Sequence, residues 1–188
     1  MKIVDFTTRP GAIDGLVTVT MKQVTDERGT VRELFRRSAF ADAGASFGQI
    51  EQINVTLTHL GGVRGMHAEQ ITKLVAVAHG RAQGVYVDIR PGSPTFGLVD
   101  EVDLEPGVQV LVPSGVANGF QALVPATQYA YCFDSEWEPG MPGSAFTPLD
   151  PLVVDRWPLP IDPDDPAQIS AKDRSAPTFT QLRQGAPS

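Results

Sequence analysis

Cysteine is almost missing from this sequence of 188 residues, which has only Cys132. A single cysteine excludes an internal disulfide, so the fold has to be stabilised by a buried apolar core. The sequence also lacks an apolar run long enough for a membrane-spanning helix, and its first residues do not resemble a secretory leader. We therefore expect a cytoplasmic protein with no membrane partner.

Positive charge is also scarce. There are 15 lysine and arginine residues against 22 aspartate and glutamate residues, which gives a net charge of −7. A protein that holds nucleic acid through phosphate contacts needs a clustered cationic surface, so we expect no nucleic-acid partner. An anionic ligand would have to be bound locally, by a few basic side chains.

Helical periodicity is confined to a short piece near Arg37–Ala43 and to the segment after Pro177, too little for the crossover helices of a parallel sheet. Short β-rich runs separated by Gly, Pro and Asp instead fill residues 16–137, as is typical of a sandwich or barrel. We predict a single all-β domain over residues 1–188, with an N-terminal extension at 1–15 and a C-terminal strap at 158–188 that begins with PLPIDPDDP. The predicted strand runs are GLVTVTMKQV, TVRELF, GQIEQINVTLT, TKLVAVAHG, AQGVYVDIR, GVQVLVP, GFQALV and TQYAYCF.

One predicted strand, GQIEQINVTLT at 48–58, has an unusual polar face. Its even-numbered positions from 52 to 58 carry amides and hydroxyls, whereas its odd-numbered positions from 53 to 57 carry aliphatic side chains. Successive side chains of a strand point to opposite sides, so one face is polar without being charged. Such a face is either solvated or lines a cavity. Because aromatic residues recur on one face of TQYAYCF, we favour a cavity inside a small barrel.

Two glycine-spaced segments resemble the motif pair of the cupin superfamily, whose fold is a jelly-roll barrel of antiparallel strands. The first runs from Gly61 to His67 and Glu69, and the second is GVQVLVPSGVAN, which ends at Asn118. Metal-binding cupins have histidines at the positions of Glu69 and Asn118. A transition metal needs three or four His, Cys or carboxylate ligands, which this set does not supply. We therefore expect a cupin-type jelly-roll barrel with short peripheral helices and no metal.

His67 is the candidate for acid–base chemistry among 3 histidines. It lies in RGMHAEQITK between Arg64 and Lys73, in locally cationic surroundings that suit an anionic ligand or a reaction that develops negative charge. Imidazole exchanges its proton near neutral pH. His59 and His79 lie at predicted strand ends beside turn glycines, so we interpret them as surface or turn residues.

Ordered blocks from about Gly15 to Pro177 resemble the dTDP-4-dehydrorhamnose 3,5-epimerase family. Many blocks in the family's order carry more weight than RGMH alone. The resemblance implies a cofactor-independent isomerase that inverts carbon 3, carbon 5 or both of a dTDP-linked 4-keto-6-deoxyhexose through an enolate, in deoxysugar biosynthesis. The blocks are DERGTVRELF, QINVT, VRGMH, TKLV, VDIRPGSPTFG, VPSGVANGF, YAYCFDSEW, PLDP, RWP and ISAKD.

The resemblance also implies catalytic roles. His67 is similar to the family's base, Asp150 in PLDP to the carboxylate that orients it, and Tyr131 to the phenol that returns a proton on the opposite face. Lys73 would stabilise the enolate oxygen. These groups suit the reaction because a carbon beside a ketone is only weakly acidic and needs a base, an electrophile and an acid.

Binding roles carry over in the same way. Gln52, Asn54 and Arg64 match residues that hold the nucleotide and its diphosphate, and Arg64 suits phosphate through its fork of donors. Trp137 stands where an aromatic side chain stacks on the base.

Arg28 and Glu33 match a segment that, in the family, reaches the nucleotide of the partner subunit. The resemblance therefore implies a homodimer.

The sequence departs from the family at three places. The usual His-Gly-Phe after the second motif begins here with Asn118, the usual Phe of the first block is Val31, and Ala-Glu-Gln follows His67. Asn118 can donate a hydrogen bond to the substrate but cannot carry a charge or accept a proton. The sugar and the number of inverted centres therefore stay open.

Alternatives also stay open. Lys73 could be an edge-strand lysine, Tyr131 a core aromatic residue and Asp150 a turn former before Pro151. The whole chain could bind a nucleotide sugar without turnover, or act as a ketoisomerase that moves the keto group between carbons 3 and 4. Because the residues occur together in the family's order, we favour the epimerase.

Overall fold

The computed structural model of the protein describes residues 1–45 and 47–185. Short antiparallel strands make up most of the regular structure, and the helices are few. The strands are β1 (Lys2–Val4), β2 (Thr7–Pro10), β3 (Val17–Thr20), β4 (Gln23–Asp26), β5 (Gly29–Arg32), β6 (Gln52–Thr58), β7 (Val63–Glu69), β8 (Lys73–His79), β9 (Ala82–Asp88), β10 (Val99–Leu104), β11 (Val108–Val112), β12 (Val116–Ala122), β13 (Thr127–Phe133) and β14 (Gly143–Ala145). The helices are α1 (Arg37–Asp42), the 3₁₀ helix η1 (Val154–Arg156), α2 (Ala171–Arg174) and α3 (Phe179–Gly185).

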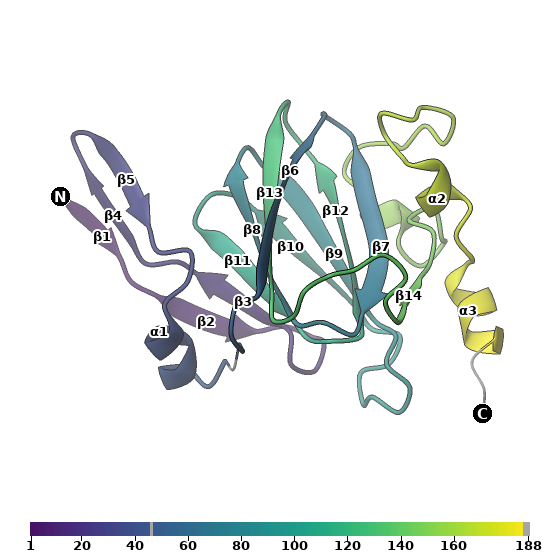
Figure 1. Ribbon diagram of the computed structural model, residues 1–188. Coiled ribbons are helices and arrows are strands. Elements are labelled where there is room, and N and C mark those ends of the chain that lie inside the picture. The colour runs from purple at the N-terminus through teal and green to yellow at the C-terminus, as the bar shows by residue number, and fades with distance from the viewer. Residues whose placement is uncertain (46, 186–188) are drawn as a thin grey trace.

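Two antiparallel sheets form the barrel at the centre of the molecule (Figure 1). One has the strand order β10-β9-β12-β7-β14, and the other has the order β2-β3-β11-β8-β13-β6. Alternate apolar side chains of both sheets share one core, to which β8 contributes Val75 and Val77, β9 contributes Tyr86 and β12 contributes Phe120. The predicted fold class, an all-β cupin-type barrel with short peripheral helices, is confirmed.

A third sheet, with the order β1-β4-β5, projects from one side of the barrel (Figure 1). Residues 1–15, which the sequence predicts as an extension, contain β1 and β2. These strands pair with β4 and β3 respectively, so the extension is built into two sheets.

The predicted strap runs against the five-stranded sheet. The side chain of Gln121 on β12 exchanges two hydrogen bonds with the backbone of Leu159, each 2.9 Å long. Farther along the strap, the backbone oxygen of Gln168 accepts from the backbone N–H of Val63 over 2.7 Å. These bonds fix α2 beside β7 (Figure 1). Within residues 1–45 and 47–185, no helix has the length and apolarity that a membrane crossing would need.

The outer faces of the two barrel sheets are covered unequally. Phe146, Val153 and Trp157 pack over the five-stranded sheet. Phe40 of α1 and nearby Phe47 pack over part of the six-stranded sheet. The odd-numbered face of β6, at the edge of that sheet, stays exposed.

Candidate active site

His67 lies on β7 and faces a hollow between β7 and the β13–β6 edge of the other sheet. Arg64 and Glu69 face the same hollow, although positions 64 and 67 would lie on opposite faces of a regular strand. The register with β12 explains this, because Arg64 pairs with Phe120 and His67 pairs with Asn118, so that β7 has one residue more than β12 over the interval. This bulge turns all three side chains toward one cavity.

The bulge depends on two glycines. Gly65 has a φ of +143°, and a Cβ at this position would lie 2.5 Å from Cα of Gly119 on β12. Position 119 also favours glycine, because a Cβ there would lie 2.7 Å from Sδ of Met66. The close approach of β7 and β12 at these glycines fixes the position of His67.

The imidazole of His67 is paired with Asp173. Nε2 of His67 lies 2.8 Å from Oδ1 of Asp173, whose side chain is almost buried. Asp173 lies in α2, and its backbone N–H donates to Oγ of Ser170, which caps this helix. Burial raises the pKa of Asp173, but the hydrogen bond and charge of His67 outweigh burial and leave this pKa below its usual value. The carboxylate is therefore ionised near neutral pH and stabilises a protonated imidazole.

The prediction that Asp150 orients His67 is wrong. Oδ1 of Asp150 accepts from the backbone N–H of Leu152 over 2.8 Å, and Oδ2 accepts from that of Phe179 over 2.7 Å. These bonds close the turn at Pro151 and fix the start of α3. Asp150 is thus the turn former that the alternative interpretation describes.

Tyr131 faces the hollow from the opposite sheet. It lies on β13, where its ring stacks on Phe133 at 5.8 Å between centroids and contacts Tyr129 at 4.8 Å. Burial raises the pKa of Tyr131, Arg64 opposes this shift, and the carboxylates of the site raise it further. The phenol is therefore neutral near neutral pH and can donate a proton.

Two adjoining cavities form the hollow, one of about 210 Å³ and one of about 490 Å³. Both are lined by Thr56, Arg64, His67 and Tyr131. The polar face of β6 supplies part of the wall, so the interpretation of that face as the lining of a cavity is confirmed. The predicted site residues that line the smaller cavity are Asn54, Arg64, His67, Lys73, Asn118, Tyr131 and Trp137.

Lys73 is buried beside the smaller cavity, and its ammonium group has three acceptors. Nζ donates to Oε2 of Glu69, to Oδ1 of Asn118 over 2.8 Å and, more weakly, to the backbone oxygen of His67 over 3.5 Å. Burial lowers the pKa of Lys73, and Glu69 opposes this shift. Burial raises the pKa of Glu69, but the charge and hydrogen bond of Lys73 outweigh it and lower this pKa. Because three acceptors face the ammonium, we interpret the pair as ionised.

The same contacts test whether the cupin metal positions fit an ion. Glu69 and Asn118 stand at those positions, and the ammonium of Lys73 contacts both. In the part of the chain that the structure describes, no group of three or more His, Cys, Asp and Glu side chains is arranged to hold a metal. Glu69 and Asn118 therefore suit the ammonium of Lys73, a cation that the chain itself supplies, and do not suit a metal ion.

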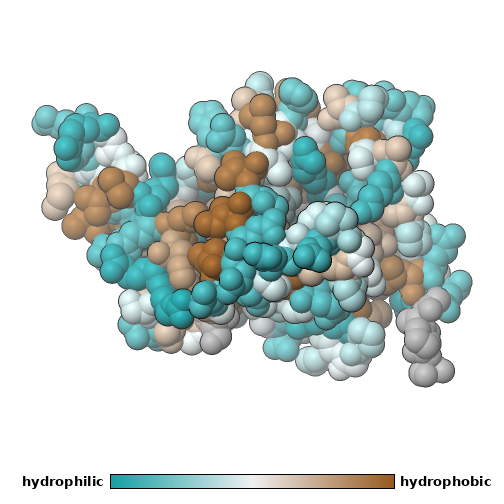
Figure 2. Space-filling model, in the orientation of Figure 1, coloured by the Kyte–Doolittle hydropathy of each residue, from teal (hydrophilic) through white to brown (hydrophobic). Residues whose placement is uncertain are grey.

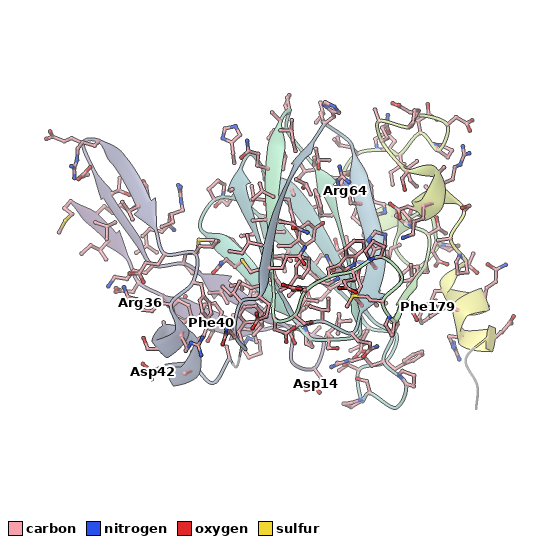
Figure 3. All side chains as sticks on the ribbon, viewed as in Figure 1. Asp14, Arg36, Phe40, Asp42, Arg64 and Phe179 are labelled. Carbon is pink, nitrogen blue, oxygen red and sulfur yellow. The ribbon has the colours of Figure 1, made fainter. Side chains whose placement is uncertain are left out.

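Gln52 lies beside the cavity and connects two of its lining residues. Its Nε2 donates to Oδ1 of Asn54 over 3.0 Å, and its Oε1 accepts from the backbone N–H of Trp137 over 2.7 Å. Arg64 donates from Nε to Oγ1 of Thr58 over 3.2 Å, and it lies on the side of the barrel nearest α2 (Figure 3).

Arg28 and Glu33 are not brought to the hollow of their own chain. Arg28 lies in the turn between β4 and β5, where it pairs with Asp26 and its side chain is 90% exposed. Glu33 pairs with Arg36. Arg36 lies beside α1, across the molecule from Arg64 (Figure 3).

Sequence reasoning missed Asp173 and Lys172, which both line the larger cavity. Both lie in the ISAKD block, and the spacing from Ser170 to Asp173 is a capping signal that predicts the start of a helix. It does not predict that this helix packs against His67, which is 106 residues away from Asp173.

The chain is similar to several known proteins. It matches the family described as dTDP-4-dehydrorhamnose 3,5-epimerase over residues 10–181. It is 33% identical over 161 residues to a dTDP-4-dehydro-6-deoxyglucose 3-epimerase of Streptomyces bikiniensis, which covers 82% of this chain and 80% of that protein. It is also 33% identical over 178 residues to a dTDP-4-dehydrorhamnose 3,5-epimerase of Mycobacterium tuberculosis, with 91% and 86% covered. The crystal structure of NovW, a 4-keto-6-deoxy sugar epimerase of Streptomyces spheroides, matches with a TM-score of 0.87 and 26% identity over 97% of this chain and 92% of that one.

Proposed function

This chain belongs to the dTDP-4-dehydrorhamnose 3,5-epimerase family, and we propose that it inverts carbon 3, carbon 5 or both of a dTDP-linked 4-keto-6-deoxyhexose without a cofactor. One observation carries the proposal. His67, paired with Asp173, and the neutral phenol of Tyr131 line one cavity from opposite sheets. Inversion of a centre beside a ketone needs a base on one face of the sugar and an acid on the other.

His67 acts as the base in this proposal. The ring nitrogen that does not bind Asp173 takes the proton from the carbon beside the ketone, and the electrons move to the keto oxygen to form an enolate. The ionised carboxylate of Asp173 stabilises the imidazolium that forms. Tyr131 then donates its proton to the same carbon from the opposite face, which inverts the centre.

Lys73 stabilises the enolate. Of the three contacts of its ammonium, the one with the backbone oxygen of His67 is the longest, at 3.5 Å. The keto oxygen can replace this weak contact, while Glu69 and Asn118 keep their bonds to Nζ. A fixed cation in a half-enclosed site stabilises developing negative charge more than water does.

Basic side chains at the larger cavity suit the diphosphate. Arg64 and Lys172 both line it, and the acidic chain elsewhere would repel an anion. We assign the thymine end of the nucleotide to Gln52, Asn54 and Trp137. Asn118 remains a hydrogen-bonding group beside the sugar.

We also propose that the protein works as a homodimer. Ile53, Val55 and Leu57 on the outer face of the edge strand β6 are 53%, 59% and 57% exposed. Val31, on the projecting sheet, is 72% exposed. Figure 2 shows apolar side chains on the projecting sheet and on the barrel face next to it. A second copy that covers these surfaces would bury them and bring Arg28 and Glu33 to its own nucleotide.

Solvent deuterium exchange tests the activity. We expect NMR of dTDP-4-keto-6-deoxyglucose in D₂O to show deuterium entering carbon 3, carbon 5 or both in the presence of the enzyme. Because one relative is named as a 3-epimerase and another as a 3,5-epimerase, the carbon that exchanges decides the number of centres. His67→Ala should slow exchange by about 100-fold or more.

Tyr131→Phe separates the two proton transfers. We expect exchange without inversion, because His67 can still remove and return a proton on one face while the opposite face has no donor. An unchanged exchange rate in His67→Ala would exclude this residue as the base. Binding with no exchange in the wild type would instead support a non-catalytic protein, and movement of the keto group would support a ketoisomerase.

A further inference from the structure

Glu69 is a carboxylate inside the proposed sugar site to which the epimerisation steps give no role. It ends β7, two residues after His67, and so faces the same hollow. Its side chain is 21% exposed, and it lines both the 210 Å³ cavity and a neighbouring cavity of about 260 Å³ beside Trp137. A charged group in this position meets any sugar that enters.

Each N–H donor of the Lys73 ammonium already has an acceptor in the protein. An ammonium group has three N–H donors, and here they face Oε2 of Glu69, Oδ1 of Asn118 and the backbone oxygen of His67. Only the long contact with His67 can be given up at low cost. Lys73 can therefore offer the substrate one donor.

Glu69 still has an oxygen for the substrate. Within residues 1–45 and 47–185, Lys73 is the only side chain that hydrogen-bonds to this carboxylate, and it uses Oε2; the backbone N–H of Glu69 itself also donates to the carboxylate and lowers its pKa. The two oxygens of a carboxylate together have about four acceptor positions, so these partners leave Oε1 able to accept from the substrate. An ionised carboxylate is purely an acceptor, so Oε1 selects a group that donates. The Lys73–Glu69 pair thus presents one donor and one acceptor side by side.

A ketone with a hydroxyl on the next carbon matches this pair. In a 4-keto-6-deoxyhexose the keto carbon has two neighbours, of which carbon 3 bears a hydroxyl and carbon 5 bears the methyl group and the ring oxygen. If the keto oxygen takes the open donor of Lys73, the hydroxyl that can reach Glu69 is the one on carbon 3.

We propose that Glu69 is a specificity-determining residue whose Oε1 accepts a hydrogen bond from the hydroxyl on carbon 3 of the hexose. This inference rests on the proposed function. It makes the chain selective for sugars that carry a hydrogen-bond donor at carbon 3.

Fluorine in place of a hydroxyl tests this contact, because fluorine has a similar size but cannot donate. We would measure the binding of dTDP-6-deoxyglucose, which cannot react because it has a hydroxyl in place of the keto group, and of its 3-deoxy-3-fluoro and 2-deoxy-2-fluoro counterparts. The oxygen of the carbon 4 hydroxyl can accept the hydrogen bond from Lys73 that the keto oxygen accepts in the substrate. In the wild type the 3-fluoro ligand should bind about 10–100-fold more weakly than the parent, as expected for loss of a hydrogen bond to a charged group. The 2-fluoro ligand should bind within about threefold of the parent.

Glu69→Gln is the matched variant, because the amide keeps the shape and an oxygen for Lys73 but can turn an N–H₂ donor toward the sugar. Its preference for the 3-hydroxyl over the 3-fluoro ligand should fall to within about threefold. Glu138→Gln removes another carboxylate beside the 260 Å³ cavity and should keep the wild-type preference. dTDP alone should bind equally to all three proteins.

The outcomes separate the inference from the proposed function. If the wild type binds the 3-fluoro ligand as tightly as the parent, or if Glu69→Gln keeps the full preference, the assignment of Glu69 is wrong and the epimerase proposal stands. The comparison of the parent and 3-fluoro ligands on the wild type needs no variant. It therefore tests the assignment of Glu69 even if Glu69→Gln folds poorly. If none of the sugar nucleotides binds the wild type more tightly than dTDP, both the inference and the proposed sugar site fail.

Discussion

At the residue scale, the contact between His67 and Asp173 gives the proposed base a carboxylate partner. Asp173 contacts the imidazole at 2.8 Å, and its lowered pKa keeps it ionised. Asp173→Asn should therefore lower kcat by about 100-fold or more, because the amide cannot stabilise the imidazolium as an anion does. Epimerisation followed by NMR at saturating substrate would measure this loss.

Asp150→Asn is the control for Asp173→Asn. An amide accepts with one oxygen only, so it cannot satisfy both backbone N–H groups that Asp150 binds. We expect the free energy of unfolding to fall by about 1–3 kcal/mol and kcat to stay near the wild-type value. A large loss of kcat in Asp150→Asn with normal activity in Asp173→Asn would reverse our assignment of the two carboxylates.

The tyrosines give a prediction on pH. Tyr86, Tyr129 and Tyr131 are the 3 tyrosines of the chain, and burial raises the pKa of each of them. A folded pKa above the unfolded value means that folding favours the neutral phenol, so this stabilisation is present below about pH 10 and is lost as the pH rises further. We expect little tyrosinate absorbance from the folded protein at about pH 10, where the urea-unfolded protein should be about half ionised. Early ionisation of one tyrosine in the folded state would contradict the proposed proton donor.

How much of the site the sequence predicts depends on how local each residue's role is. His67 could be singled out because Arg64 and Lys73 flank it in the sequence, whereas Lys73 and Tyr131 received their roles from the family resemblance. Asp150 and Asp173 could not be told apart in this way. Each is a carboxylate in a polar turn or helix start, and only the packing of α2 against β7 decides which one meets the imidazole.

At the scale of single elements, the bulge in β7 determines which side chains share the cavity. A Cβ at position 65 would meet the backbone of β12 at 2.5 Å from Cα of Gly119. Gly65→Ala should therefore push β7 away from β12, lower the free energy of unfolding by about 1–3 kcal/mol and reduce kcat by at least about tenfold. Thermal unfolding and the deuterium exchange assay would measure the two effects.

Gly92→Ala is the matched control for Gly65→Ala. Gly92 also has a positive φ, of +78°, but a Cβ there would meet no atom within 4 Å. This variant should share the backbone strain without the clash, so its kcat should stay near the wild-type value. Equal losses of kcat in both variants would show that the close approach of the strands is unimportant.

The predictability of each element follows from its sequence pattern. Strands β8, β9, β11 and β13 were predicted because their alternating or continuous apolar residues are typical of buried sheets. Strand β10, with the sequence VDEVDL, was missed because acidic side chains occupy its exposed positions. Strands β1 and β2 are short and mostly exposed, so they have too few apolar residues to give a pattern.

At the scale of the whole molecule, the proposed homodimer predicts that two inactive variants restore activity when they are combined. If Arg28 acts in the partner's site, an active site needs His67 from one chain and Arg28 from the other. We expect Arg28→Ala and His67→Ala to be nearly inactive alone. When the two are unfolded and refolded together, about half of the dimers should be mixed and each of these should have one intact site, which gives about a quarter of wild-type activity.

Val55→Asp tests the surface through which we propose that two copies pair. A charge at the centre of the exposed aliphatic row on β6 should favour the monomer, which light scattering would detect. A protein that is monomeric in the wild type, or a mixture of variants with no recovered activity, would rule out the shared site.

The position of Asp173 has a consequence for biosynthesis. The last barrel strand, β14, ends at Ala145, whereas the carboxylate that partners the base comes 28 residues later in α2. A nascent chain on the ribosome therefore contains every barrel strand before it contains the carboxylate on which the proposed proton transfer depends. We expect proton transfer only after α2 has been made, and a chain cut just before that helix would lack both the carboxylate partner of the base and one cation of the larger cavity.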